Sequence, residues 1–267
     1  MLNNKDVKLK MPAVFIGHGS PMNAIEENEF VHNWRLLGEQ LFVPKAIISI
    51  SAHWETRGTL VTSMLSPRTI HDFGGFPHAL YQIQYSAPGN PALATELTQM
   101  IKTTTVATDE AWGLDHGTWS VLSRIYPHAG IPVIQLSLDR YKTPEQHYQL
   151  AKHLNYLRNN GVLIIGSGNI VHNLGLVDWN KPGDYAYGHD WAIEANELVK
   201  RLINEKDHTA LVHYTKLGKA VQLAVPTPDH FLPLLYVLAL QDNDDTIKFF
   251  NDKAVMGSLT MTSVIIG

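Results

Sequence analysis

Residues 162–172 read VLIIGSGNIVH, and this stretch decides how the rest of the chain is interpreted. Its first four residues, Val162–Ile165, are all large and apolar, which is typical of a strand that is buried on both faces of a parallel sheet. The small residues Gly166-Ser167-Gly168 end the apolar run, and His172 follows shortly afterwards. The stretch therefore predicts a central strand with a histidine beyond its carboxyl end.

Two other parts of the chain repeat this order. The apolar run Ala13–Ile16 precedes His18, and the run Ala46–Ile50 precedes His53. In open α/β sheets, ligands bind beyond the carboxyl ends of the strands, so we expect His18, His53 and His172 to converge on one crevice. The chain has 14 His and no Cys, and neutral imidazole is the commonest metal ligand in proteins. Together these features predict one metal centre.

Apolar runs and amphipathic segments alternate along the rest of the chain. This alternation predicts a single α/β domain with a mostly parallel or mixed central sheet flanked by helices. Further strands are expected at Thr59–Ser63, Thr103–Thr108 and Pro132–Ser137, and helices at Asn33–Leu41, Pro91–Lys102, Thr118–Tyr126, Pro144–Asn159, Gly188–Asn204 and Asp229–Leu240. Two last strands, Thr246–Phe250 and Ser258–Ile266, are expected to pair at a sheet edge. We expect residues 1–10 to form a flexible N-terminal segment and residues 11–267 a single catalytic domain.

Composition excludes several classes of function. The net charge of -4 argues against a nucleic-acid partner, which would need a basic face. The N-terminus lacks the apolar core of a signal peptide, and the longest apolar stretch, Phe231–Leu240, has only half of the roughly 20 residues that a membrane helix needs. Without Cys there is no disulfide, thiolate metal site or cysteine nucleophile. We therefore expect a cytoplasmic protein without a membrane partner, as a monomer or small homo-oligomer.

Two segments have the composition of functional loops. Ser66–Pro77 contains paired aromatics and a Gly-Gly hinge, and Asp109–Trp119 contains two Trp and His116. Loops rich in aromatics and His often bind ligands, although Phe73 and Phe76 could equally serve only to fold the first loop onto the core. No compact metal motif of the His-Glu-x-x-His type occurs. A metal site must therefore be assembled from distant parts of the chain.

The residues around the histidines resemble a known family. Its motifs match Gly17-His18-Gly19-Ser20-Pro21-Met22, Ser51-Ala52-His53-Trp54, residues 70–77 (IHDFGGFP), residues 112–117 (WGLDHG), residues 167–173 (SGNIVHN), residues 226–234 (PTPDHFLPL) and Met256-Gly257-Ser258-Leu259. In this order they resemble the 4,5-DOPA extradiol dioxygenase family, which belongs to the class III extradiol ring-cleaving dioxygenases. The resemblance runs from about Met11 to the C-terminus, and it implies the fold of that class.

The resemblance also implies a mononuclear non-haem metal site, with one divalent ion per chain. Iron(II) is expected for activity, and zinc(II) is expected in the isolated protein. By position, His18, His53 and His230 match the family's metal ligands. His172 matches a histidine that acts on the substrate and also ligates the metal in an empty site, and His116 matches a second histidine near the substrate.

The third ligand position departs from a common pattern. Many non-haem iron oxygenases use two His and one carboxylate, and Asp229 is the carboxylate adjacent to His230. If both residues lie on a helix, neighbouring side chains point about 100° apart, and only one can reach the metal. We therefore expect His230 to be the ligand.

The implied chemistry suits these residue types. A catechol must lose protons to chelate a metal, and a neutral imidazole can accept one near neutral pH. Since O2 also needs a vacant metal position, three protein ligands suit the reaction better than four. We assign the acid and base role to His172 and a helper role to His116. Arg57, Arg68 and Asp72 are candidates for binding a charged substrate tail, but a solvated surface charge is the better explanation for each of them taken singly.

Other classes of function stay open from the sequence. A Memo-like relative would share the fold but act as a binding or regulatory protein, and a zinc hydrolase would also use three His and an open water position. A serine hydrolase is disfavoured because no Gly-x-Ser-x-Gly motif occurs. A dinucleotide site at Gly166-Ser167-Gly168 is disfavoured because Val171 stands where the third glycine is needed.

Overall fold

The computed structural model describes residues 10–267, so most of the expected N-terminal segment, residues 1–9, lies outside the described residues. Lys10, its last residue, is held in place, because its ammonium group pairs with Asp242 at 2.8 Å and with Asp245 at 2.7 Å.

A six-stranded sheet forms the centre of the domain, with strand order β6-β2-β8-β1-β12-β9. Its strands are β1 (Ala13–Gly17), β2 (Ala46–Ser51), β6 (Val133–Gln135), β8 (Val162–Gly168), β9 (Ile247–Phe250) and β12 (Ser263–Ile266). The first four of these run parallel, while β12 is antiparallel to both β1 and β9. The sheet is therefore mixed, and the expected pairing of the last strands at one edge is confirmed.

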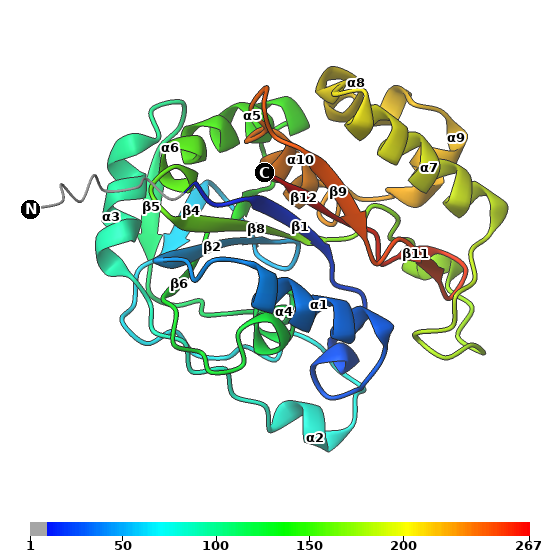
Figure 1. The fold of residues 1–267 in the computed structure, drawn as a ribbon, viewed down its shortest axis with the longest axis horizontal. Helices are drawn as coiled ribbons and strands as arrows, with labels where there is room; N and C mark the ends of the chain where they lie inside the picture. Colours follow the sequence, from blue (N-terminus) through cyan, green and yellow to red (C-terminus); the bar gives the residue numbers. More distant parts are fainter. Residues whose placement is uncertain (1–9) are drawn as a thin grey trace, which may run out of the picture.

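Helices cover both faces of this sheet (Figure 1). They are α1 (Glu29–Gln40), α2 (His78–Tyr81), α3 (Pro91–Met100), α4 (His116–Ile125), α5 (Pro144–Ala151), α6 (Asn155–Arg158), α7 (Asp190–Asn204), α8 (His208–Val212), α9 (Lys219–Ala224) and α10 (Leu232–Leu238). Helices α1 and α4 lie against one face, and α5, α6 and α10 lie against the other. No helix among residues 10–267 has the length and apolarity needed to cross a bilayer.

Alternation along the strands builds a core on each face. In β1, Ala13 and Phe15 pack into the core beneath α5 and α10, whereas Val14 and Ile16 pack into the core beneath α1 and α4. This follows from the strand period of two, which sends successive side chains to opposite faces. Because both faces are covered, both sets of side chains are apolar, as residues 162–165 predict.

Three two-stranded pairs lie outside the central sheet. They are β3 (Glu55–Thr56) with β7 (Leu138–Asp139), β4 (Thr59–Thr62) with β5 (Val106–Asp109), and β10 (Ala254–Val255) with β11 (Leu259–Thr260). The last pair divides the strand expected at Ser258–Ile266, because Leu259 and Thr260 pair with β10 before the chain joins the central sheet at Ser263.

Three expected helices differ from the structure. The helix expected at Asn33–Leu41 begins earlier, at Glu29, because the Asn28 side chain caps it by accepting from the Val31 N–H. The segment Pro144–Asn159 is interrupted by a single 3-10 turn between α5 and α6. The helix expected at Asp229–Leu240 begins only at Leu232, because the Pro228 carbonyl accepts hydrogen bonds from the N–H groups of Phe231 and Leu232 in a preceding turn. His230 therefore lies in a turn and not on a helix.

Candidate metal centre

Three of the histidines follow neighbouring strands of the central sheet. Strands β2, β8 and β1 are adjacent and parallel, and their carboxyl ends meet at one edge. His53 follows β2, His172 follows β8 and His18 follows β1. The structure therefore brings these residues to one crevice, as the strand pattern predicts.

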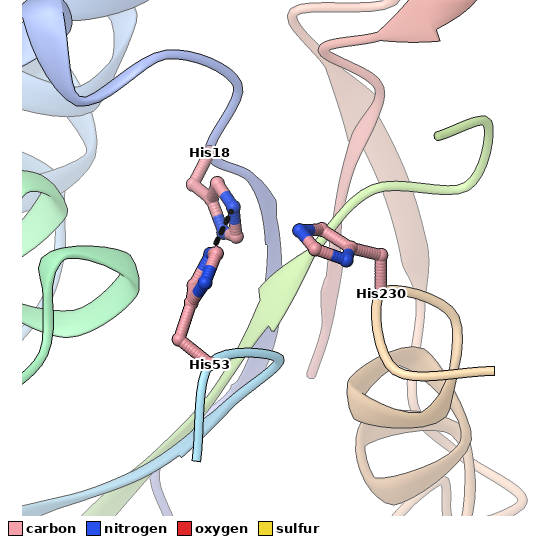
Figure 2. Close-up of side chains that lie close together, drawn as sticks. All are labelled: His18, His53 and His230. Atoms are coloured by element: carbon pink, nitrogen blue, oxygen red, sulfur yellow. Dashed lines mark hydrogen bonds between the residues drawn. The ribbon is translucent and has the colours of Figure 1, made fainter. Parts of the chain in front are cut away.

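His18, His53 and His230 form a group of converging imidazoles (Figure 2). One ring nitrogen of each lies within 4.8 Å of the corresponding atoms of the other two, and the Nε2 atoms of His18 and His53 are 3.1 Å apart. His230 points toward this pair from the turn before α10. A zinc ion bound about 2.0–2.1 Å from each nitrogen would hold tetrahedral ligand nitrogens roughly 3.3 Å apart.

Glycines in β8 allow the turn that carries His230 to approach. A Cβ added at Gly168 would lie 2.1 Å from the His230 carbonyl oxygen, and one at Gly166 would lie 2.3 Å from the Pro233 carbonyl oxygen. The His230 carbonyl accepts a hydrogen bond of 3.0 Å from the Asn169 N–H. The Gly-Ser-Gly sequence thus serves close backbone packing at the site.

Asp229 acts as the hydrogen-bond partner of the His230 ring. The Nδ1 of His230 donates a hydrogen bond to the Asp229 carboxylate. The helical geometry assumed for these two residues does not apply, because both precede α10, but the group with His18 and His53 includes His230 and not Asp229. Burial raises the pKa of the Asp229 carboxyl, but the hydrogen bond from His230 and the charge of His230 outweigh it and lower that pKa to about 2.

The tautomer of His18 is set by the residue behind it. The Ser167 hydroxyl donates its only proton to the Gly117 carbonyl, so its oxygen must accept from the His18 Nδ1, 2.9 Å away. The Nε2 of His18 then carries a lone pair toward the centre. Hydrogen bonding of the outer ring nitrogen is the usual way in which proteins orient a metal-binding His.

Burial keeps the imidazoles of His18 and His53 neutral. It is the main cause that holds the pKa values of His18 and His53 well below the usual value, and the other imidazoles add repulsion against a positive charge. Imidazole nitrogens that converge on one point suit a divalent cation. The donor set, with nitrogen only and no thiolate, fits both zinc and iron(II).

His172 lies beside this group and not within it. Its ring stacks on that of His230, with 3.4 Å between ring centroids and 5° between planes. Its ring nitrogen groups with those of Asp229 and His230, while the group with His18 and His53 does not include it. Burial, followed by the charge of His230, lowers the pKa of His172 to about 3. Its imidazole is therefore uncharged at neutral pH.

Asp72 holds His116 beside His53. The His116 ring centroid lies 3.9 Å from that of His53. One oxygen of Asp72 accepts from the His116 backbone N–H at 2.9 Å, and the other accepts from its Nδ1 at 2.9 Å and lies 3.6 Å from the His53 Nδ1. With Nδ1 protonated, the His116 Nε2 is left as an acceptor.

Sequence reasoning missed this role of Asp72, which it considered only as a partner for a substrate tail. Its position between His71 and Phe73 in an aromatic loop was the available signal, but the contact joins residues 44 positions apart.

A cavity of about 480 Å³ opens onto these histidines. Apolar side chains form most of its wall, and Phe73 and Phe76 contribute to that wall while also packing on the core beneath α1 and α4. Arg57 and Arg68 do not line it, and the guanidinium of Arg68 donates to the Ala111 carbonyl at 2.6 Å. The arginines considered for binding a substrate carboxylate are therefore not placed to do so.

Residues 12–266 match the family described as the catalytic LigB subunit of aromatic ring-opening dioxygenase. The chain belongs to this family and is an aromatic ring-opening dioxygenase of the extradiol class.

Curated relatives and a solved structure agree with this family. The chain is 47% identical over 262 residues to 4,5-DOPA dioxygenase extradiol of Escherichia coli (strain K12), covering 97% of this chain and 95% of that one. It is 38% identical to a Beta vulgaris protein of the same name, covering 82% and 83% of the two chains. The crystal structure of an uncharacterized protein from Escherichia coli K12 has a TM-score of 0.83 and 41% sequence identity, covering 96% of this chain and 100% of that one.

These similarities confirm the α/β fold class, the family resemblance and the enzyme class that the sequence motifs predicted. They favour a ring-opening dioxygenase over the Memo-like and hydrolase alternatives. The roles of the individual histidines stay predictions.

Proposed function

We propose that the protein opens the ring of a catechol such as L-DOPA by 4,5-cleavage and gives a muconate semialdehyde. Both oxygen atoms of O2 enter the product, and the carbon–carbon bond beside the diol breaks without an external reductant. The observation that carries the proposal is the convergence of three imidazoles, flanked by His172 and His116, at one end of a cavity.

We propose that His18, His53 and His230 hold one divalent metal. When bound, the metal supplies a site for the deprotonated diol and, as iron(II), a redox-active centre for O2. Three protein ligands leave coordination positions open for both reactants. Zinc(II) would occupy the same nitrogen donors but has no redox chemistry.

The flanking histidines would handle protons. His172 is neutral at physiological pH and can accept a proton from one diol hydroxyl, then return it as the ring opens. His116, held through its Nδ1 by Asp72, presents an unprotonated Nε2 that can orient the other hydroxyl. The apolar wall that includes Phe73 and Phe76 would pack on the aromatic ring and exclude water. A monomer or small homo-oligomer in the cytoplasm stays the expectation for the whole enzyme.

Anaerobic reconstitution tests the proposal. Metal-free protein loaded with iron(II) should consume one O2 per catechol and form a yellow semialdehyde, whereas the zinc-loaded protein should be silent. An iron-loaded protein that consumes no O2 with any catechol would contradict the enzyme proposal. Hydrolysis by the zinc-loaded protein in air-free buffer would support the hydrolase alternative instead.

A further inference from the structure

The cavity also contains polar side chains away from the histidines, and most of them are already hydrogen-bonded within the protein. The Ser20 hydroxyl accepts from the Met22 N–H at 3.2 Å. Asn28 donates to Asn23 at 2.8 Å, and Asn23 in turn donates to the His18 carbonyl at 3.1 Å. Asn23 and Asn28 thus hold the segment after β1 against the His18 carbonyl, while the Ser20 hydroxyl keeps its proton as a donor. None of these three groups carries a charge.

Two carboxylates in the same wall differ from these neutral groups because they are charged. Glu26, just after the 3-10 helix Pro21–Ala24, and Asp184, in the loop between β8 and α7, both line the cavity and are exposed. Within residues 10–267, neither carboxylate takes part in an ion pair or a side-chain hydrogen bond. The wall contains no Lys or Arg among the described residues. Apart from the histidines, its ionisable groups are therefore acidic.

Arg124 lies beside Glu26 but does not pair with the Glu26 carboxylate. The Arg124 guanidinium donates to the backbone carbonyls of Asn23 and Glu26 and to the Glu27 carboxylate at 3.0 Å. Glu27 also pairs with Arg35 and lies outside the cavity wall. Arg124 is thus paired with the Glu27 carboxylate and contacts only the backbone of Glu26.

We propose that Glu26 and Asp184 select catechols whose side chain carries a positive charge, such as an ammonium group, and disfavour those with only a carboxylate. This inference rests on the proposed function of the same cavity, because the diol must sit at the histidines for its tail to face these residues. Opposite charges attract and like charges repel within the few ångströms of a bound ligand. Since both carboxylates are exposed, each should contribute roughly 2- to 5-fold in discrimination.

Three catechols of similar length but different side-chain charge test the effect of charge separately from that of shape. Dopamine carries a cation, 4-ethylcatechol is neutral and dihydrocaffeate carries an anion. With iron-loaded protein, kcat/KM should fall in that order, and the spread should shrink at high ionic strength because salt screens exposed charges. In the double variant Glu26→Gln, Asp184→Asn, the ratio of dopamine to dihydrocaffeate should fall by on the order of 10-fold.

Glu39→Gln is the matched control, because Glu39 is exposed on α1 and lies outside the cavity wall. It should leave the ratio unchanged. Calorimetric binding of dopamine and dihydrocaffeate to the zinc-loaded protein gives a second readout that does not need turnover, and it should show the same order of affinity.

Equal kcat/KM for the two charged catechols, a preference for the anion, or an unchanged ratio in the double variant would overturn the inference while leaving ring cleavage intact. If no catechol is cleaved, the proposed function fails, and the binding order of the two compounds still decides whether the cavity selects a cation.

Discussion

Hydrogen bonds behind the imidazoles decide which ring nitrogen faces the cavity. Ser167 accepts from the Nδ1 of His18, and Asp229 accepts from the Nδ1 of His230. In both rings the Nε2 is left to face the centre with its lone pair. A neutral imidazole has one donor and one acceptor nitrogen, so the partner on the outer side determines whether the inner nitrogen can bind a metal.

His18 and His172 should respond differently to removal. The change His18→Ala deletes one of three converging nitrogens, so we expect loss of the metal itself, and His53→Ala should act in the same way. The change His172→Ala leaves all three nitrogens in place, so most of the metal should stay while turnover falls by about 10²- to 10⁴-fold, the usual contribution of an acid–base group. Metal per chain by mass spectrometry and initial rates of O2 uptake measure the two effects.

A His172→Ala protein that lost its metal as completely as His18→Ala would show that His172 is a fourth ligand. Circular dichroism of each variant should match the unsubstituted protein, so that metal loss is not a consequence of unfolding.

Asp72 is expected to act through His116. The change Asp72→Asn removes the anion that accepts from the His116 Nδ1, so His116 can adopt the other tautomer and lose its Nε2 lone pair. We expect kcat to fall about 10- to 100-fold, with a smaller change in KM. Steady-state kinetics with iron-loaded protein measures both constants.

Asp109→Asn is a suitable comparison for this variant. Asp109 accepts from backbone N–H groups of Ala111 and Trp112 in a neighbouring loop and contacts none of the five histidines of the site. If both substitutions lowered kcat equally, the effect of Asp72 would come from loop stability and not from His116.

The position of His230 depends on how two elements pack, namely β8 and the turn before α10. A side chain at Gly168 would collide with the His230 carbonyl, since its Cβ would lie 2.1 Å from that oxygen. We therefore expect Gly168→Ala to push the turn away from β8, to destabilise the protein by roughly 1–3 kcal/mol, and to weaken metal binding. Urea denaturation and a competitive zinc chelator report the two effects.

Gly130→Ala provides the control, because no atom lies within 4 Å of a Cβ at that position. Wild-type metal affinity in Gly168→Ala would mean that the turn can shift without moving the His230 ring, and it would refute this account of the glycine.

One buried side chain, Arg158, links segments near the two ends of the described chain. Arg158, at the end of α6, is fully buried and donates to the carbonyls of Met11, Leu240 and Ile266. Its charge is balanced by Asp245, whose carboxylate lies 2.5 Å away. These hydrogen bonds connect the residue before the start of β1, the end of α10 and the end of β12, and β1 and β12 are an antiparallel pair in the sheet.

Removing the carboxylate should destabilise the whole domain. The change Asp245→Asn leaves the buried Arg158 charge uncompensated, which costs about 3–5 kcal/mol in comparable cases. Asp242→Asn is the control, since Asp242 is more exposed and pairs with Lys10 at the surface, where an ion pair contributes at most about 1 kcal/mol. Urea midpoints at pH 7 compare the two variants, and equal midpoints would contradict the bridging role.

The same pair predicts a dependence of stability on pH. Burial raises the pKa of the Asp245 carboxyl, but hydrogen bonds from Arg158 and Lys10 outweigh it and lower that pKa from 3.8 to about 2. A lowered pKa means that the unfolded chain binds the proton more readily. This stabilisation is therefore complete above pH 3.8 and is lost as the pH falls toward 2. The urea midpoint of Asp245→Asn should fall less steeply across that window.

Much of this architecture follows from local patterns in the chain. The apolar runs before His18, His53 and His172 predicted β1, β2 and β8, and a strand buried on both faces has a distinctive composition because every side chain must be apolar. The helix expected from Pro144 likewise begins at that residue, where the Thr143 side chain accepts from the Gln146 N–H. Short sequence motifs around the histidines identified the family, because each motif consists of residues that are close in sequence.

Local patterns could not place the groups that act across the fold. That β2, β8 and β1 are neighbours follows from packing, not from their order in the chain. Asp72 meets His116, and the turn at His230 meets Gly168, only after the sheet and its helices have assembled. The chain by itself therefore determined which residues could bind a metal and move protons. Tertiary structure decided which nitrogen faces the cavity at His18 and His116, because Ser167 and Asp72 are far from them in sequence. Asp229 is adjacent to His230 in sequence, but the turn that lets the two side chains meet depends on packing against Gly168.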